Sequence, residues 1–377
     1  MRLCEDGSLV FASISSRNTT RERSAKCRTL PIPFCISAVL AGFLLFPFAG
    51  RTQVSSLAPQ KSLSTADSLI HDGKLDEAIA LLENVLQKEP QAPGVEAKLA
   101  KAYYKKRVFR QAIAHFKRAL EQDPDDPETA QLLGLSFYFT GEFQQAIPLL
   151  EKIQPHIPSG ELDPWYLLGV CYLKTEQPDK ARAAFARMFS VSPDGPTAHL
   201  LFAQMMVRQH LEEKAVPELE KAISDDPRLP MAHFLLGEIY LYQVNPQRAL
   251  VEFKKELEIN PSVWLVYWRL GDAHARLGNY SEAEKVLKQA IWLNDSFTGA
   301  YLLLGEVELK KGDAELASGF LERALKLDPK NSFVHYSLAK AYQQLGRAAD
   351  ANRHFAITRS LRAEKKSEEQ IFFQETR

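Results

Sequence analysis

Histidines, cysteines and carboxylates are the side chains of this chain that could carry metal or catalytic chemistry. The 377 residues include nine histidines, four cysteines and 47 aspartates and glutamates. Zinc sites, thiol chemistry and serine nucleophiles need such residues at short fixed spacings, as in Cys-x-x-Cys, His-Glu-x-x-His or Gly-x-Ser-x-Gly. None of these patterns occurs in the sequence, and neither does a glycine-rich phosphate loop. The sequence therefore predicts no metal site, no cofactor and no enzymatic activity.

The histidines follow a structural period and not a ligand spacing. His199, His233 and His335 are separated by multiples of 34 residues. Rings occupy the equivalent place elsewhere in the chain, at Trp165, Tyr267 and Tyr301. We therefore expect this recurring site to pack a planar ring. The remaining histidines show no partner set in the sequence: His71, His115, His156, His210, His274 and His354.

The cysteines predict no disulfide framework. Cys4, Cys27 and Cys35 lie before residue 50, and Cys171 is the one thiol in the rest of the sequence. A single thiol cannot form an intramolecular bridge, and no two of the cysteines have metal-ligand spacing. Cysteine usage is thus compatible with any compartment.

The charges balance over the whole chain but not along it. Lysine plus arginine and aspartate plus glutamate both total 47. Residues 1–58 hold seven basic and three acidic side chains, which leaves 40 basic against 44 acidic in the remainder. A mildly acidic body without a basic stripe argues against a nucleic-acid partner.

The chain is organised by a 34-residue period, which is clearest in residues 93–126. With Pro93 as position 1, this unit has alanine at positions 8 and 20, Ala100 and Ala112, and a ring at position 24, Phe116. Position 20 is alanine in nine consecutive units: Ala78, Ala112, Ala146, Ala181, Ala215, Ala249, Ala283, Ala317 and Ala351. Two amphipathic helices, A and B, that cross closely at the small residues account for this pattern.

The pattern resembles the tetratricopeptide repeat, and the resemblance covers roughly residues 59–365. Units begin near residues 59, 93, 127, 162, 196, 230, 264, 298 and 332. The resemblance implies an all-α fold, an α-solenoid of antiparallel helix pairs wound into the tetratricopeptide-repeat superhelix, with a concave groove lined by the A helices. We expect a polar helix over residues 359–377 to cap the end of the solenoid.

Local signals predict where the helices begin and end. Glycines at position 15 should end helix A in a left-handed conformation, and they are Gly73, Gly141, Gly278, Gly312 and Gly346. Asp126 and Asp163 each precede a proline and should cap the following helix A. Glu256 and Thr358 are polar at position 27, where other units are apolar, so we expect looser packing at these two junctions.

An uncharged segment, residues 30–50, lies between a basic polar leader (1–29) and a predicted linker (51–62). The segment contains an apolar core of signal-peptide length, and its full length could just span a bilayer. Four basic residues precede it, which predicts that the repeats are exported across an inner membrane. The repeats would then be periplasmic or secreted if the segment is cleaved, or held outside the cytoplasm by a single transmembrane anchor if it is not.

The resemblance also implies that positions 2, 5, 9, 12 and 13 of helix A face the groove. The candidate groove residues at these positions are Tyr104, Tyr138, Tyr166, Arg208, Phe234, Tyr242, Trp268, Arg276 and Tyr336. Exposed rings with nearby charges suit an extended peptide or a partner helix. The charges include two expected intrahelical ion pairs, Asp272–Arg276 and Glu306–Lys310. No asparagine occupies position 9, so the clamp by which some family members bind chaperone tails is not expected.

Two functions fit these observations. The first is a non-catalytic scaffold that binds a protein or peptide partner in its groove, with no nucleic acid and no small-molecule substrate. The second is a substrate-recruiting or assembly subunit of an envelope-associated enzyme complex, with catalysis on another chain. Co-purification with an enzyme would favour the second function.

Overall fold

The structure, a computed structural model, describes residues 2–3, 9–10, 57–152 and 163–375. The chain divides into two compact units, Met1–Val54 and Ser55–Arg377. In the first unit, strands β1 (Arg2–Leu3) and β2 (Leu9–Val10) pair antiparallel. Residues 30–50 lie outside the described residues, and no helix within the described ranges is both long and apolar enough to cross a membrane.

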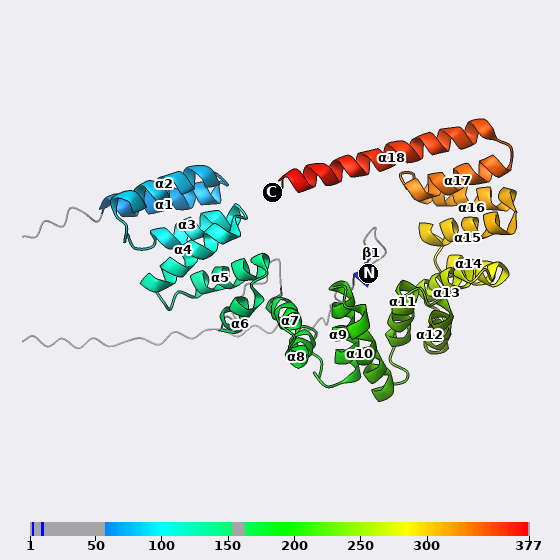
Figure 1. Cartoon of the computed structure of the whole chain (residues 1–377), viewed down its shortest axis with the longest axis horizontal. Coiled ribbons are helices and arrows are strands. Elements are labelled where there is room, and N and C mark those ends of the chain that lie inside the picture. The colour runs from blue at the N-terminus through cyan, green and yellow to red at the C-terminus, as the bar shows by residue number, and fades with distance from the viewer. Residues whose placement is uncertain (1, 4–8, 11–56, 153–162, 376–377) are drawn as a thin grey trace, which may run out of the picture. The chain divides into compact units, whose positions relative to one another are not determined.

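The second unit is an α-solenoid of antiparallel helix pairs, in which each helix packs against the next (Figure 1). The A helices are α1 (Leu57–His71), α3 (Val95–Lys105), α5 (Pro127–Thr140), α7 (Pro164–Lys174), α9 (Pro196–Arg208), α11 (Ala232–Tyr242), α13 (Trp264–Arg276), α15 (Thr298–Lys311) and α17 (Ser332–Gln344). The B helices are α2 (Leu75–Lys88), α4 (Phe109–Gln122), α6 (Phe143–Lys152), α8 (Pro178–Met188), α10 (Glu212–Asp225), α12 (Pro246–Ile259), α14 (Tyr280–Leu293), α16 (Ala314–Leu327) and α18 (Ala348–Glu375).

Helix α1 begins at Leu57, so the end of the predicted linker, residues 57–62, is helical. Pro59 suggested a break, but it occupies the first turn of α1, where a backbone N–H has no partner within the helix. Proline is tolerated at such a position because the donor that it lacks is not needed there. Residues 57–62, the end of the predicted linker, thus form the first turns of α1.

Close crossing of helices A and B explains the small residues at position 8. In α7, a Cβ atom added to Gly169 would lie 2.5 Å from the Phe185 ring of α8. In α11, the same atom on Gly237 would lie 2.5 Å from the Phe253 ring of α12. Both rings are fully buried. The ring at position 24 thus fills the space that the glycine leaves, and the pair sets how closely the two helices approach.

Position 15 adopts a left-handed backbone whether or not it is glycine. Glycines occupy it in five units, as predicted, with φ between 73° at Gly346 and 91° at Gly312. Four units hold other residues there with φ from 56° to 61°: Arg107, Glu176, His210 and Val244. A left-handed conformation strains residues that carry a Cβ atom, and a β-branched residue most of all. Val244 is therefore the most strained of the four.

Side chains at position 25 of a B helix and position 11 of the next A helix form pairs at the junctions between units. Three pairs are a tyrosine hydroxyl that donates to a glutamate: Tyr103 to Glu83, Tyr172 to Glu151 and Tyr342 to Glu322. At another junction, the Lys117 ammonium lies 5.2 Å from the centre of the Phe137 ring. These pairs fix the register of each B helix against the following A helix.

The two polar residues at position 27 are buried and find hydrogen-bond partners. Glu256 is fully buried and accepts hydrogen bonds from the backbone N–H groups of Met231 (2.9 Å) and Phe234 (3.3 Å) at the start of α11. Thr358 is buried, and its hydroxyl donates to the His354 carbonyl at 2.9 Å. Each polar group thus finds a backbone partner within its own unit, and looser packing at the junctions stays a prediction.

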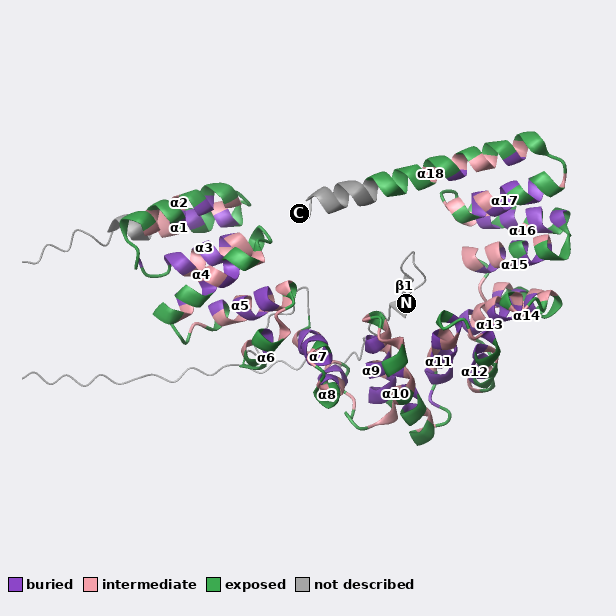
Figure 2. Cartoon of the chain, in the orientation of Figure 1, coloured by how far each residue is buried: buried purple, intermediate pink, exposed green. Residues whose placement is uncertain are grey.

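The last B helix, α18, continues past the end of the ninth unit. The helix packs against α17 and buries Ala351 and Thr358, whereas residues 359–367 are mostly exposed (Figure 2). Arg362 lies over the rings of Phe333 and Tyr336, at 5.9 and 5.5 Å from their centres. The polar extension thus covers part of the last A helix, as a capping helix should.

Candidate functional site

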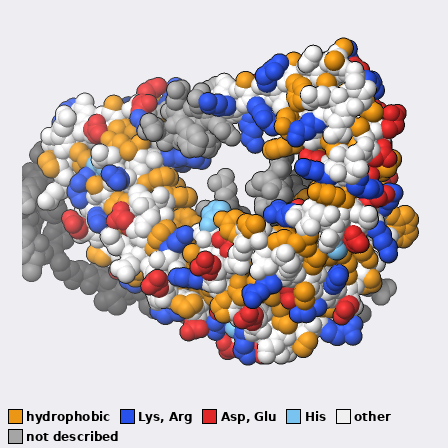
Figure 3. Space-filling model, turned by 45° about the vertical axis from the view of Figure 1, so that its right-hand side comes forward, with side chains coloured by type: hydrophobic (Ala, Val, Ile, Leu, Met, Phe, Trp, Pro, Cys, Tyr) orange, Lys and Arg blue, Asp and Glu red, His pale blue; other side chains and the backbone are white. Residues whose placement is uncertain are grey.

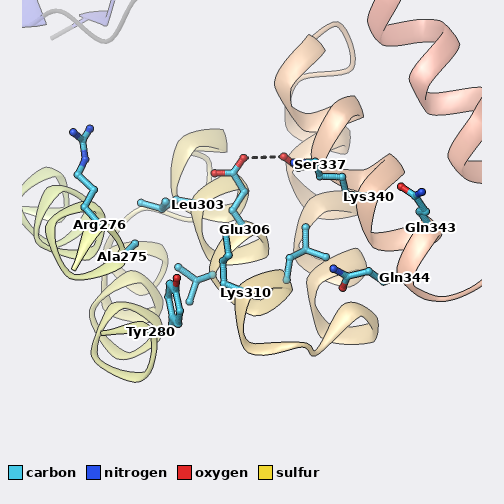
Figure 4. Close-up of a pocket in the computed structure, with 12 residues that line it drawn as sticks. Ala275, Arg276, Tyr280, Leu303, Glu306, Lys310, Ser337, Lys340, Gln343 and Gln344 are labelled. Atoms are coloured by element: carbon cyan, nitrogen blue, oxygen red, sulfur yellow. Dashed lines mark hydrogen bonds between the residues drawn. The ribbon is translucent and has the colours of Figure 1, made fainter. Parts of the chain in front are cut away.

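Two adjoining hollows lie along the A helices α11, α13, α15 and α17, which contact one another in sequence. The larger, here called the Lys310 hollow, has a volume of about 640 Å³ (Figure 4). It is lined by Ala275, Arg276, Tyr280, Leu303, Glu306, Val307, Leu309, Lys310, Ser337, Lys340, Gln343 and Gln344. Most of these residues are at positions 9, 12 and 13 of their units.

The smaller hollow, here called the Tyr242 hollow, has a volume of about 400 Å³. Its lining comes from α9 to α13: Val207, Glu212, Glu238, Ile239, Leu241, Tyr242, Val244, Arg269, Asp272 and Arg276. Tyr242 is 69% exposed and Val244 is 78% exposed. An apolar rim of this kind, with Arg276 shared between the two hollows, is a surface on which a partner side chain can be buried.

Two of the three carboxylates that line the Tyr242 hollow are paired with arginines. Glu238 lies 2.8 Å from Nε of Arg269, and Asp272 lies 2.9 Å from Nε of Arg276, which confirms the predicted Asp272–Arg276 pair. Arg276 also donates to the Leu241 carbonyl at 3.4 Å. Burial raises the pKa of Glu238, and the charge of Arg269 opposes that rise. The hydrogen bond to Asp272 raises the pKa of Arg276.

One predicted ion pair does not form in the Lys310 hollow. Glu306 accepts a hydrogen bond from the Ser337 hydroxyl of the next A helix at 2.8 Å and does not pair with Lys310 (Figure 4). Lys310 has no ion pair or hydrogen bond to any other described residue. The Lys340 ammonium lies 4.5 Å above the Tyr336 ring and has no carboxylate partner in the described part of the chain. The prediction of a Glu306–Lys310 pair is wrong because a partner on the neighbouring helix competes for the carboxylate.

Aromatic residues at position 5 do not line either hollow. Three of them pack on the ring at position 24 of their own unit: Tyr166 on Phe185, Phe234 on Phe253 and Tyr336 on Phe355, with ring centres 5.8 to 6.2 Å apart. Phe234 is only 1% exposed, so it cannot contact a partner. Trp268 packs instead edge-on against Phe297, at 4.9 Å, and under Arg269, at 4.1 Å. Phe234 is therefore too buried to contact a partner, whereas Tyr166, Trp268 and Tyr336 are partly exposed, and their assignment to a binding groove stays a prediction.

The candidate residues of the earlier units lie apart from both hollows. Tyr104 and Tyr138 are half-buried and belong to an aromatic cluster with Phe109, Phe139 and Phe143. Burial raises the pKa of Tyr138 to about 12. Arg208 is exposed at the end of α9. Of the nine predicted residues, only Tyr242 and Arg276 therefore line a hollow.

The recurring site that we expected to pack a planar ring is position 4 of each unit. Several histidines form hydrogen-bonded pairs between this position and position 23 of the same unit. Nδ1 of His199 lies 2.6 Å from Glu218, Nδ1 of His233 lies 2.6 Å from Glu252, and Nδ1 of His335 lies 2.8 Å from Nδ1 of His354. Glu96 and His115 form the same pair with the two residue types exchanged, at 2.6 Å. Position 4 is thus a polar link between helices A and B, and His115 and His354 do have partners. The sequence signal for such a pair is a histidine or glutamate at position 4 followed, 19 residues later, by a second histidine or glutamate.

Metal and thiol chemistry find no support in the described ranges. No group of three or more histidine, cysteine, aspartate or glutamate side chains there is placed to hold a metal ion. Cys171 is buried, and burial raises the pKa of its thiol to about 12. A thiol with so high a pKa is a poor nucleophile near neutral pH.

Position 6 was missed as a lining position. Arg269 and Ser337 both occupy it, and each reaches back to the carboxylate at position 9 of the preceding unit, Glu238 or Glu306. The spacing of 31 residues between a donor and a carboxylate would have revealed these contacts. Charges of both signs are interspersed over the face shown in Figure 3, so any selectivity for charge is local to a hollow.

Family models for the tetratricopeptide repeat match three segments of the chain. The segments are residues 69–135, 268–332 and 320–351. Residues 105–188 match the model for subunit 3 of the anaphase-promoting complex, cyclosome. A search of curated proteins found no match.

Several solved structures are similar to parts of this chain. MamA 41-end from Desulfovibrio magneticus RS-1 is 21% identical, with a TM-score of 0.43 over 45% of this chain and 96% of that one. YrrB, titled a TPR protein with an unusual peptide-binding site, is 19% identical, with a TM-score of 0.42 over 48% and 93% of the two chains. The APC/C hetero-tetramer Cut9–Hcn1 is 17% identical, with a TM-score of 0.40 over 76% and 57%. Likenesses of this size identify no partner for this chain.

Proposed function

We propose that this chain, a solenoid of tetratricopeptide repeats, is a non-catalytic scaffold that binds an extended segment of a partner protein across α11 to α17. The observation that carries the proposal is the pair of adjoining hollows along these A helices. They share Arg276 as a common wall, so one extended segment can occupy both. Tyr242 and Val244 add exposed apolar surface at the rim, where a single buried side chain can supply much of the binding energy.

The scaffold is proposed as an exported protein, an inference that depends on residues 30–50 and the basic residues before them. The hydrophobic segment would carry the repeats across an inner membrane, either as a cleaved signal or as an anchor. Protease protection of the repeats in intact cells would support export. Digestion of the repeats only after the inner membrane is broken is the expected result, whereas residence in the cytosolic fraction would contradict it.

The binding function can be tested with two exposed aromatic residues of the chain. Tyr242 lies at the rim of a hollow, whereas Trp292 is 77% exposed on the B helix α14 and lines neither hollow. In a crosslinking pull-down with the full chain, Tyr242→Ala should lose most of the recovered partner, and Trp292→Ala should recover as much as the wild type. Equal recovery by both variants would show that the groove is not the binding surface.

A further inference from the structure

We infer that the partner segment is acidic where it occupies the Lys310 hollow, an inference that rests on the proposed function. The observation behind it is the pair of lysines, Lys310 on α15 and Lys340 on α17, which both line this hollow and have no carboxylate partner among the described residues. An ammonium group is stabilised by an anion held nearby, and two of them in one hollow favour an anionic occupant.

Lysines on the other A helices are not all paired alike: Lys105, at the same position 13 as Lys310, donates to the Ile70 carbonyl at 3.4 Å and has no carboxylate partner among the described residues, whereas other lysines do have one. In the first units, Lys98 pairs with Asp67 at 2.5 Å, and Lys101, at the same position 9 as Lys340, pairs with Glu128 at 2.7 Å. Glu306 is the one carboxylate among the residues that line the Lys310 hollow, and it accepts a hydrogen bond from the Ser337 hydroxyl instead of pairing with a lysine. The hollow therefore holds two unpaired ammonium groups against one unpaired carboxylate, which leaves an excess of positive charge for an occupant.

The rest of the hollow suits a carboxylate that comes from outside. Gln343 and Gln344 lie at the end of α17 and carry amide N–H donors, and Tyr280 carries a hydroxyl donor. The floor contains Leu303 and the buried Val307, which can cover the methylene groups of a glutamate side chain. A carboxylate can accept several hydrogen bonds at once, and those from ammonium groups are the strongest.

Charge complementarity favours a separate protein over the other anions and over this chain. Residues 1–58 of the chain carry seven basic and three acidic side chains, so their net charge has the same sign as that of the lysines. The remainder carries 44 acidic against 40 basic side chains, and nucleic acid would be repelled by that surface. An acidic peptide segment meets the two lysines without covering a large anionic surface.

The test uses the full chain and an array of spotted dodecapeptides, each printed in three versions. The versions carry aspartate and glutamate, the corresponding amides, or lysine at the same positions. The acidic versions should bind, the amide versions should bind about tenfold more weakly and the lysine versions should not bind, because a charge-assisted hydrogen bond contributes roughly this factor. Binding of all three versions alike would overturn the acidic inference and leave the proposed function standing, whereas binding of none would overturn both.

Lysine variants then locate the effect by fluorescence anisotropy with the strongest acidic peptide. Lys310→Gln with Lys340→Gln should weaken binding about tenfold and abolish the preference for the acidic version. The matched control, Lys326→Gln with Lys330→Gln, removes the same charge from exposed residues that line neither hollow, and it should bind as the wild type does.

Two further measurements distinguish an acidic peptide from nucleic acid and from a second copy of the chain. A single-stranded DNA 20-mer should bind no better than the lysine peptides; tighter, Lys310-dependent binding of the DNA would overturn the inference. In sedimentation, the full chain should not self-associate through these lysines. Any self-association should therefore be the same in the wild type and in the double lysine variant. Self-association that the double lysine variant reduces would make a second copy the occupant and would also overturn the inference.

Discussion

The two hollows share Arg276 and are lined from the same repeat positions, yet their charged side chains are paired differently. In the Tyr242 hollow, position 6 is Arg269, which pairs with Glu238, so cations and carboxylates are matched within the chain. In the Lys310 hollow, position 6 is Ser337, which takes up Glu306 and leaves Lys310 without a carboxylate. The residue at position 6 therefore decides whether the carboxylate at position 9 of the preceding unit forms an ion pair or a hydrogen bond with a neutral hydroxyl.

The largest expected effect compares that position directly. Arg269→Ala would leave Glu238 poorly hydrated, without its cation and close to Asp272, and should cost about 2 kcal/mol of unfolding free energy. Ser337→Ala should cost about 1 kcal/mol, since it removes one hydrogen bond to the more exposed Glu306. Urea unfolding followed by circular dichroism measures both. Equal losses of unfolding free energy would mean that the Glu238–Arg269 pair stabilises the fold no more than the Ser337–Glu306 hydrogen bond does.

An intermediate effect is expected at the rim of the Tyr242 hollow, where stability and binding should move in opposite directions. Val244→Gly relieves a left-handed backbone with φ of 56° and should raise the unfolding free energy by about 0.5 kcal/mol, while partner recovery falls. The equivalent position of the next unit provides the control. Gly278→Val meets no atom within 4 Å of its Cβ but must adopt φ near 76°, and it should lose about 1 kcal/mol. A less stable Val244→Gly variant would show that the valine packs usefully and is not retained for binding.

The smallest expected effect is a loss of stability at low pH that involves His354. Burial lowers the pKa of His354, with His335 and Arg353 adding to the shift and Asp350 and Glu322 opposing it. Because the pKa of this histidine is lower in the folded chain than in the unfolded one, the unfolded chain binds more protons, and stability falls as pH drops through about 6.5. His354 packs on α17, which carries Ser337 and Lys340.

The measurement is the urea midpoint at pH 7.5 and at pH 5.5. The loss at the lower pH should be below about 1 kcal/mol, since His354 is partly exposed to solvent. His354→Phe keeps a ring but cannot titrate, so it should reduce the difference between the two midpoints. A variant as sensitive to pH as the wild type would assign the dependence to other groups, such as His274, whose pKa is also lowered by burial.

The period and the packing residues were predictable from the sequence, because each helix pair repeats the same local geometry. Ala112 and Phe116 mark the crossing of α3 and α4, and Asp126 and Asp163 accept hydrogen bonds from the first turns of α5 and α7 as expected. These signals act within a few residues or within one unit. They therefore do not depend on how neighbouring units meet.

The candidate site was predicted less well, because its details depend on contacts between units. The partner of Glu306 lies 31 residues away on another helix, and a pattern four residues long cannot reveal it. Phe234 was assigned to the groove from its position alone, but a glycine at position 8, Gly237, lets the Phe253 ring reach it and enclose it. Whether a ring at position 5 is exposed is decided by the size of its neighbours.

The side-chain pairs at positions 25 and 11 have a consequence for how such a chain can change in length. Deletion of residues 93–126 in frame would bring Phe137 to Glu83, where Tyr103 now donates, and the carboxylate would lose its hydrogen-bond donor. Deletion of residues 264–297 would instead bring Glu308 beside Lys254, two side chains of opposite charge. Gain or loss of whole repeats by recombination is therefore constrained junction by junction, and not by the 34-residue period alone.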